Sequence, residues 1–135
     1  MFATLVLSLH VFASVSLNPT ALRLGSLQFS CVVNKIDTGT CAMDTGSDVP
    51  LTMNPLQAKI DRITCTTQAA IETIGGQVSS CVGKTTLTID GQTETVPVYV
   101  ESDWHWVPLV GVPALQEFWP NGMSVNWQTR EVTGF

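Results

Sequence analysis

Charged side chains are scarce in this chain of 135 residues. Only 13% of the residues are Asp, Glu, Lys or Arg, and the six Lys and Arg residues form no cluster. Nucleic acids and anionic membranes are recognised mainly through clustered cations. With a formal net charge of −5, the sequence therefore predicts neither nucleic acid nor a membrane as a partner.

Metal-binding patterns are also absent. No pair of cysteines has the Cys-x-x-Cys spacing, and the only histidines are His10 and His105. We therefore expect no metal site, and nothing in the sequence calls for a cofactor. The chain has four cysteines, an even number that would permit two disulfides in a secreted protein: Cys31, Cys41, Cys65 and Cys81. Their apolar or β-like surroundings favour four reduced, mostly buried thiols.

No apolar run is long enough to span a membrane. The longest candidate, Met1 to Leu17, is too short and is interrupted by Ser8 and His10. It has the length of a signal peptide but lacks a preceding cation, so a remnant of an upstream polyprotein or an N-terminal strand remains an alternative. The protein would be secreted in the first case and cytoplasmic if it is a polyprotein fragment. We assign residues 1–20 to an N-terminal segment and 21–135 to one folded domain.

Long helical patterns and repeats are missing, and short β-like runs alternate with turn residues instead. Strands are predicted at 27–36, 40–43, 49–53, 65–74, 77–82, 84–89, 93–100, 107–112, 123–127 and 130–133. Tight turns are predicted at 37–39, 75–76 and 90–91, and Asn18-Pro19-Thr20 indicates a turn or linker. Short helices are predicted at 56–63, after the cap signal Asn54-Pro55, and at 113–118. This succession predicts a mostly-β barrel or sandwich with one or two short helices.

Two Asp-Thr-Gly motifs stand close together, at Asp37 and at Asp44. The second reads Asp44-Thr45-Gly46-Ser47 and follows the apolar residues Ala42 and Met43, whereas Asp37 stands in polar surroundings that suit a turn. A carboxylate can hold or activate a water molecule, and a glycine two residues later lets the backbone approach it closely. Asp44 is therefore the candidate catalytic residue.

The run from Cys41 to Val49 resembles the active-site loop of the retropepsins, the aspartic proteases of retroviral type. Three later segments resemble other parts of that family in the right order. These are the glycine-tipped hairpin 71–83, the Leu-Val-Gly segment 109–115 and the closing hairpin 124–132. The likeness covers about residues 24–132. The chain departs from the family pattern at Pro50, Pro113 and Asn126, which puts substrate preference and local packing in question.

The resemblance implies a closed or partly open barrel of the retropepsin type, with one lobe per chain. It implies an aspartic endopeptidase that works as a homodimer on a retroviral or retrotransposon polyprotein, because one chain offers only one credible catalytic aspartate. Its site residues are implied by the same resemblance. The catalytic loop would be Asp44, Thr45 and Gly46, and the substrate-binding residues would be Ser47, Asp48, Ile74, Gly75 and Gly76.

Two other functions stay open at this point. The chain could be a catalytically inactive domain of the same fold that dimerises or binds peptides. It could also be a small secreted β protein that binds a ligand and is held together by disulfides. Peptide cleavage that disappears in Asp44→Asn separates the first from the protease, and a count of free thiols tests the second.

Overall fold

The computed structural model describes residues 13–135, with the side chains of Thr73 and Val78 left aside. This part of the chain contains ten strands and three short helices. The prediction of a mostly-β barrel is confirmed.

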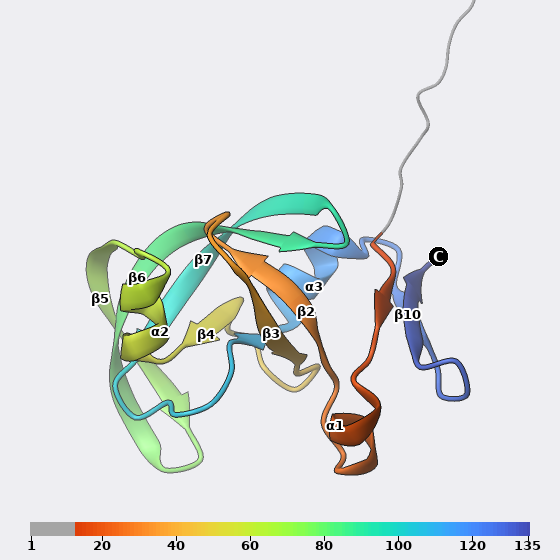
Figure 1. Cartoon of the computed structure of the whole chain (residues 1–135). Coiled ribbons are helices and arrows are strands. Elements are labelled where there is room, and N and C mark those ends of the chain that lie inside the picture. Colours follow the sequence, from red (N-terminus) through yellow and green to blue (C-terminus); the bar gives the residue numbers. More distant parts are fainter. Residues whose placement is uncertain (1–12) are drawn as a thin grey trace, which may run out of the picture.

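Seven strands form the main sheet, in the order β2-β3-β8-β4-β7-β6-β5. An additional pairing between β2 and β6 closes six of them into a barrel and leaves β5 outside it (Figure 1). Their bounds are β2 Gln28–Val33, β3 Thr38–Met43, β4 Leu51–Met53, β5 Cys65–Thr73, β6 Gly76–Ile89, β7 Gln92–Glu101 and β8 Leu109–Val110. The pairing of β2 with β6 leaves no open edge in the ring of six strands. Strand β5 pairs only with β6 and extends the sheet beyond the ring.

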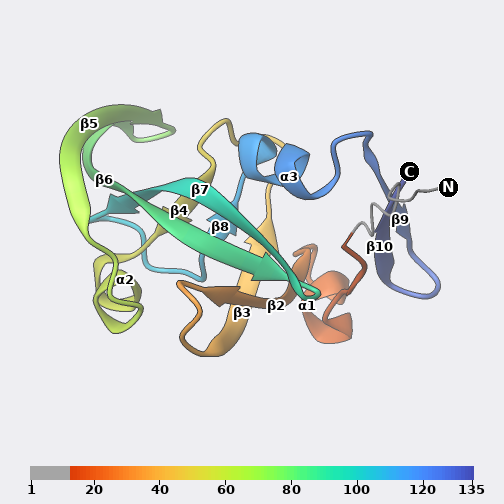
Figure 2. The ribbon, with the colours of Figure 1, turned by 90° about the horizontal axis from the view of Figure 1, so that it is seen from above.

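A second, smaller sheet has the order β1-β10-β9, with bounds Val15–Ser16, Glu131–Gly134 and Met123–Asn126. It lies at the opposite end of the molecule from the β5–β6 hairpin (Figure 2). Ala13 and Leu17 are buried, and the indole N–H of Trp119 donates to the Ala13 carbonyl at 2.7 Å. Residues 13–17 are thus packed into the fold. Residues 1–12, on which the signal-peptide prediction mainly rests, lie outside the described residues.

The three helices are α1 Pro19–Arg23, α2 Pro55–Ile60 and α3 Val112–Phe118. The sequence predicted one or two helices, and α1 is the one it missed. The stretch from Asn18 to Thr20 was expected to be a turn, but the Asn18 side chain accepts a hydrogen bond from the Ala21 N–H and begins a helix. Asn54 caps α2 in the same way, as predicted. The error at Asn18 arises because an asparagine followed by a proline occurs both in turns and at the start of short helices. None of the described helices is long and apolar enough to cross a membrane.

Three predicted turns and strand ends differ from the structure. The β2–β3 turn is at Asn34 and Lys35, which both have positive φ, and not at 37–39. The β5–β6 turn is at Ile74 and Gly75, one residue earlier than predicted. Strand β6 runs unbroken through Gly83, whereas the sequence predicted two separate strands on either side of this residue. A Cβ atom there would lie 2.2 Å from the Thr64 carbonyl oxygen, so this glycine permits a close approach of two backbones.

The core fills the barrel and extends under α3. Its largest fully buried apolar side chains are Phe118, Leu51, Met53, Leu87, Ile89, Val96, Val98, Val110 and Val132. Val96, Val98 and Val100 alternate with more exposed residues along β7, so one face of that strand points into the core. The barrel therefore provides a rigid support for the loops at its ends.

The four cysteines are paired, so the prediction of reduced thiols is wrong. Cys31 and Cys41 join β2 to β3 with their Cα atoms 5.9 Å apart, and Cys65 and Cys81 join β5 to β6 with 5.5 Å between theirs. The first pair is buried, but Cys65 is exposed. Strand-like surroundings are typical both of isolated core thiols and of disulfides between neighbouring strands. Each pair, however, lies on two antiparallel neighbours, which brings its members within bonding reach.

The buried disulfide generates a stability prediction. The double variant Cys31→Ala, Cys41→Ala should lose about 2–4 kcal/mol of unfolding free energy, because the cross-link no longer restricts the unfolded chain. Urea unfolding of both oxidised proteins measures this. Most of the difference should vanish when both are unfolded in dithiothreitol. Alkylation of the denatured, unreduced wild type should find no free thiol, and four labelled cysteines would contradict the pairing.

Candidate functional site

The Asp44 loop, residues 44–50, connects β3 to β4, and both of these strands pair with β8. Ala42 and Met43 of β3 run parallel to Leu109 and Val110, and Leu51 and Thr52 of β4 run antiparallel to the same two residues. The Asp44 N–H continues this pairing by donating to the Val110 carbonyl at 2.9 Å. Both ends of the loop are therefore fixed to one central strand.

The Asp44 side chain is half-buried and is held by its own loop. Its Oδ1 accepts a hydrogen bond from the Gly46 N–H at 2.8 Å. A Cβ atom on Gly46 would lie 3.2 Å from the same oxygen, so a side chain there would crowd the carboxylate. Thr45, between them, is exposed. The carboxylate is thus oriented by a backbone donor while part of it stays open to solvent.

The rest of the loop turns back against β8. The Ser47 carbonyl accepts from the Val112 N–H at 2.8 Å, and the Ser47 hydroxyl accepts from the Val49 N–H at 3.2 Å. Gly111 lies directly behind: a Cβ atom there would be 2.0 Å from the Val49 carbonyl oxygen and 2.8 Å from that of Ser47. Only a residue without a side chain fits, because the loop backbone occupies that space.

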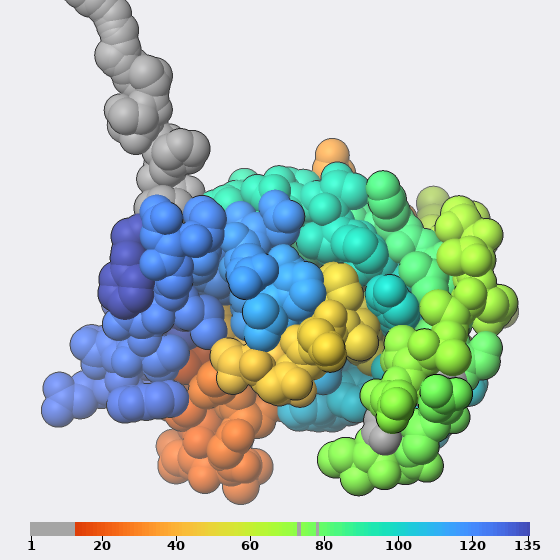
Figure 3. All heavy atoms as spheres, turned by 180° about the vertical axis from the view of Figure 1, so that it is seen from behind, coloured from red at the N-terminus to blue at the C-terminus, as the bar shows by residue number. Residues whose placement is uncertain are grey.

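An open cleft of about 490 Å³ separates this loop from the β5–β6 hairpin. Figure 3 looks onto the face of the molecule where the gold loop and the green hairpin both lie. Six of the predicted site residues line the cleft: Asp44, Gly46, Ser47, Asp48, Ile74 and Gly75. Thr45 and Gly76 are not among the lining residues. The side chain of Ile74, at the hairpin tip, is fully exposed.

Sequence reasoning missed one wall of the cleft. Glu101, Asp103 and Trp104 line it together with Thr52 and Leu109. Glu101 is only 6% exposed, and its burial, with a smaller contribution from the charge of Asp103, raises the pKa of Glu101 above its ordinary value. One signal was available: a carboxylate ends the apolar run from Val96 to Val100. From its sequence context alone, Asp103 looks like a turn residue.

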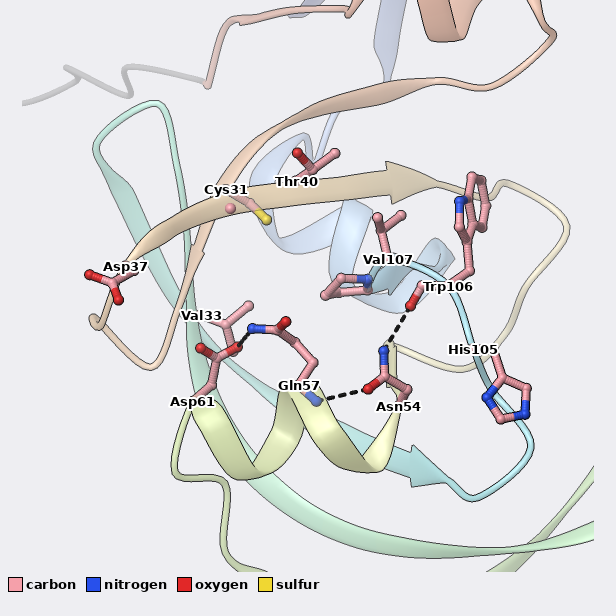
Figure 4. Close-up of a pocket in the computed structure, with 12 residues that line it drawn as sticks. Cys31, Val33, Asp37, Thr40, Asn54, Gln57, Asp61, His105, Trp106 and Val107 are labelled. Atoms are coloured by element: carbon pink, nitrogen blue, oxygen red, sulfur yellow. Dashed lines mark hydrogen bonds between the residues drawn. The ribbon is translucent and has the colours of Figure 1, made fainter.

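A second cavity, of about 360 Å³, is lined in part by the other Asp-Thr-Gly motif. Several of its polar lining residues are hydrogen-bonded to the protein itself. In Figure 4 Asp37 lies at its rim, next to the β2–β3 turn, and it is exposed. Asn54 bonds the Gln57 N–H and the Trp106 carbonyl, and the Gln57 side chain donates to Asp61. These polar groups cap and support α2, so the cavity offers few unsatisfied groups to a ligand.

The cleft at Asp44 therefore combines a positioned carboxylate, a concave surface and a hairpin that faces it. Among residues 13–135, no three His, Cys, Asp or Glu side chains converge in a way that would hold a metal ion. The chemistry that this arrangement can support is activation of a water molecule by Asp44 next to an extended ligand.

Comparison with known proteins identifies the fold. No protein-family model matches the sequence, and no curated protein matches it. A retropepsin-like aspartic protease from Rickettsia conorii superposes with a TM-score of 0.64 at 15% identity, over 91% of this chain and 89% of that one. EIAV protease complexed with the inhibitor HBY-793 gives 0.55 at 14% identity, over 84% and 93%. The retroviral protease-like domain of Ddi1 from Leishmania major gives 0.53 at 14%, over 87% and 84%.

At such low identities the likeness shows the fold and leaves the activity open. The chain has a retropepsin-like fold, as its motifs predicted.

The close packing behind the loop generates the second prediction. Gly111→Ala should destabilise the protein by at least about 1–3 kcal/mol, because the added methyl group overlaps two loop carbonyls. Gly39→Ala is the matched control, since a Cβ atom there meets nothing within 4 Å, and its effect should stay within about 0.5 kcal/mol. Urea unfolding measures both. Equal stability of the two variants would mean that the loop does not pack against Gly111.

Proposed function

We propose that this chain is one subunit of a homodimeric aspartic endopeptidase in which Asp44 supplies the catalytic carboxylate. The observation that carries the proposal is the position of Asp44. It lies on an Asp-Thr-Gly-Ser loop anchored to β8, its carboxylate accepts the Gly46 N–H, and it lines the cleft below the hairpin. The retropepsin-like fold supports this reading.

The chemistry requires a second chain. Peptide hydrolysis by this route needs two carboxylates, and two like charges about 3 Å apart cannot both ionise, so the pair shares one proton. The cleft of one chain contains only one Asp-Thr-Gly loop, since Asp37 lines the other cavity. A two-fold axis beside Asp44 would bring the second carboxylate from a second copy. The exposed Thr45 would then face the partner subunit.

The proposed reaction uses the two Asp44 carboxyl groups in different states. The ionised one removes a proton from water while the water oxygen bonds to the peptide carbonyl carbon. The protonated one donates its proton to the carbonyl oxygen. The tetrahedral intermediate then breaks its C–N bond, the nitrogen takes a proton from a carboxyl group, and an acid and an amine leave. The Gly46 N–H would keep the carboxylate oriented through this cycle.

The substrate would lie extended in the cleft, between the loop and the hairpin. An extended peptide can pair with the backbone on both sides, which is how strands are commonly added to an exposed edge. Ser47 and Asp48 on the floor, and Ile74, Gly75 and Gly76 at the hairpin tip, are the residues we propose to contact it. A retroelement polyprotein as the natural substrate stays a prediction from the sequence resemblance.

The disulfides bear on the competing functions. Pairing of all four cysteines meets one requirement of a small secreted β protein that binds a ligand. It does not favour that function over the protease, because disulfides of this kind stabilise a barrel whatever its activity. The inactive peptide-binding domain differs from the protease only in turnover. Cleavage is therefore the deciding measurement.

The third prediction places the carboxylate. Wild type should cleave members of a mixed peptide library between mildly acidic and neutral pH, and Asp44→Asn should lower the rate at least about a hundredfold, because the amide can neither accept nor share the proton. Asp37→Asn is the matched control, since it alters the other Asp-Thr-Gly motif, and it should cleave at the wild-type rate. Product analysis by mass spectrometry follows all three.

The possible failures have different meanings. If Asp44→Asn still cleaves and Asp37→Asn does not, the catalytic aspartate is Asp37 and the proposed assignment is wrong. If no protein cleaves although sedimentation finds a folded wild-type dimer, the peptide-binding function replaces the protease.

A further inference from the structure

The cleft carries a strong excess of negative charge. Five of its fourteen lining residues are acidic, and none of these described lining residues is Lys, Arg or His. The chain has eleven Asp and Glu residues in all, so nearly half of its carboxylates gather at this one surface. Asp44 and Asp48 belong to the loop. Glu72, Glu101 and Asp103 add three charges that the proposed reaction does not use. A cleft lined by one sign of charge attracts ligands of the other sign.

Glu101 is the unusual member of this group. It is 6% exposed, and its carboxylate forms no hydrogen bond or ion pair with any described residue. Ser80 lies directly opposite on β6, so the two side chains share one face of the sheet. The Ser80 hydroxyl is fully buried and also has no partner among the described residues. Glu101 therefore brings an unused hydrogen-bonding group to the cleft wall, and the buried Ser80 opposite it does not bond to it.

This arrangement disfavours folding. Burial of an unpaired carboxylate is unfavourable, and the nearby charge of Asp103 makes it more so, which raises the pKa of Glu101. The preceding residue on β7, Val100, points to the other face of the sheet. Its apolar side chain is also buried, but burial there carries no such electrostatic penalty. A destabilising charge at the wall of a binding cleft is best explained by a ligand that compensates it.

A short turn keeps Glu101, Asp103 and Trp104 together. The Trp104 N–H donates to the Glu101 carbonyl at 3.2 Å, and its indole N–H donates to the Val107 carbonyl at 3.0 Å. Trp104 and Leu109 add apolar surface to the same cleft wall. A long aliphatic stem could pack on this surface while its cationic end reaches the carboxylates. A guanidinium group could also stack on the indole ring.

We propose that Glu101, with Asp103, forms a subsite that selects a basic side chain of the peptide substrate, arginine in preference to lysine. Arginine suits it better because its planar group offers several fixed donors to two carboxylates at once. A metal ion is the poorer occupant, since no three acidic side chains of the described residues converge on one point. This inference rests on the proposed function, because it names the substrate class of the same cleft.

The test compares peptides that differ in one charge. Cleavage products of the mixed library are sequenced to find the preferred position, and one good substrate is remade with arginine or citrulline there. Citrulline has nearly the same shape but no charge. Wild type should cleave the arginine peptide about tenfold faster or more in kcat/KM, as expected for a charged hydrogen bond. Glu101→Gln should reduce this preference, measured as the ratio of the two kcat/KM values, to about threefold or less.

Glu117→Gln is the matched control. It removes the same charge from an exposed position on α3, and its preference for arginine should equal that of wild type. Glu101→Gln should also melt at a higher temperature than wild type at neutral pH. The raised pKa means that ionised Glu101 disfavours the folded state, and this disadvantage fades at low pH, where Glu101 is protonated. A lower melting temperature at neutral pH would give Glu101 a structural role and overturn the inference.

Binding separates the inference from the proposed function. Fluorescence anisotropy measures how tightly Asp44→Asn protein, with and without Glu101→Gln, binds the labelled arginine and citrulline peptides. If wild type cleaves nothing, the same pair of peptides is built on a generic extended sequence. A tenfold preference for arginine that depends on Glu101 supports the subsite even without turnover. Equal binding, or equal cleavage, of the two peptides overturns the subsite and leaves the protease proposal standing on its own test.

Discussion

The close contact between Gly111 and the Asp44 loop is the constraint on which the candidate site depends. Strand β8 has only two residues, yet β3 and β4 both pair with it, and the loop between them must fold back over its end. The carbonyl oxygens of Ser47 and Val49 occupy the space where any Cβ atom of residue 111 would lie. This contact fixes how closely the loop packs against β8, and with it the position of the Asp44 carboxylate relative to the barrel.

The barrel and the cleft have opposite requirements. The core is filled by apolar side chains in a closed ring of six strands. The cleft next to it gathers carboxylates, and neither Glu101 nor the neighbouring Ser80 side chain has a hydrogen-bond partner among the described residues. The two disulfides and the closed ring add stability away from the cleft, which can offset the strain at its wall. Stability and binding are thus carried by different parts of one small domain.

Much of the fold could be predicted because its signals are local. Strand runs, the Asn54 cap of α2 and the turn at Asp90 and Gly91 each depend on a few neighbouring residues, and the structure confirms them. The glycine-tipped hairpin and the Leu-Val-Gly segment lie where the motifs placed them, to within a residue. The errors fall where one local signal has two meanings. Asn18 and Pro19 suit a turn or a helix start, and Gly83 suits the end of a strand or the close approach of two backbones within one.

The sequence by itself favours Asp44 over Asp37 as the candidate catalytic residue and predicts the succession of strands along the chain, because apolar patterning and motif spacing are local features of the sequence. Only the tertiary structure decided which residues meet across it. It paired Cys31 with Cys41 and Cys65 with Cys81, and it brought Glu101 and Asp103 to the cleft that contains Asp44. These contacts follow from strand register and barrel closure, which place residues far apart in sequence on one surface. No local pattern specifies them.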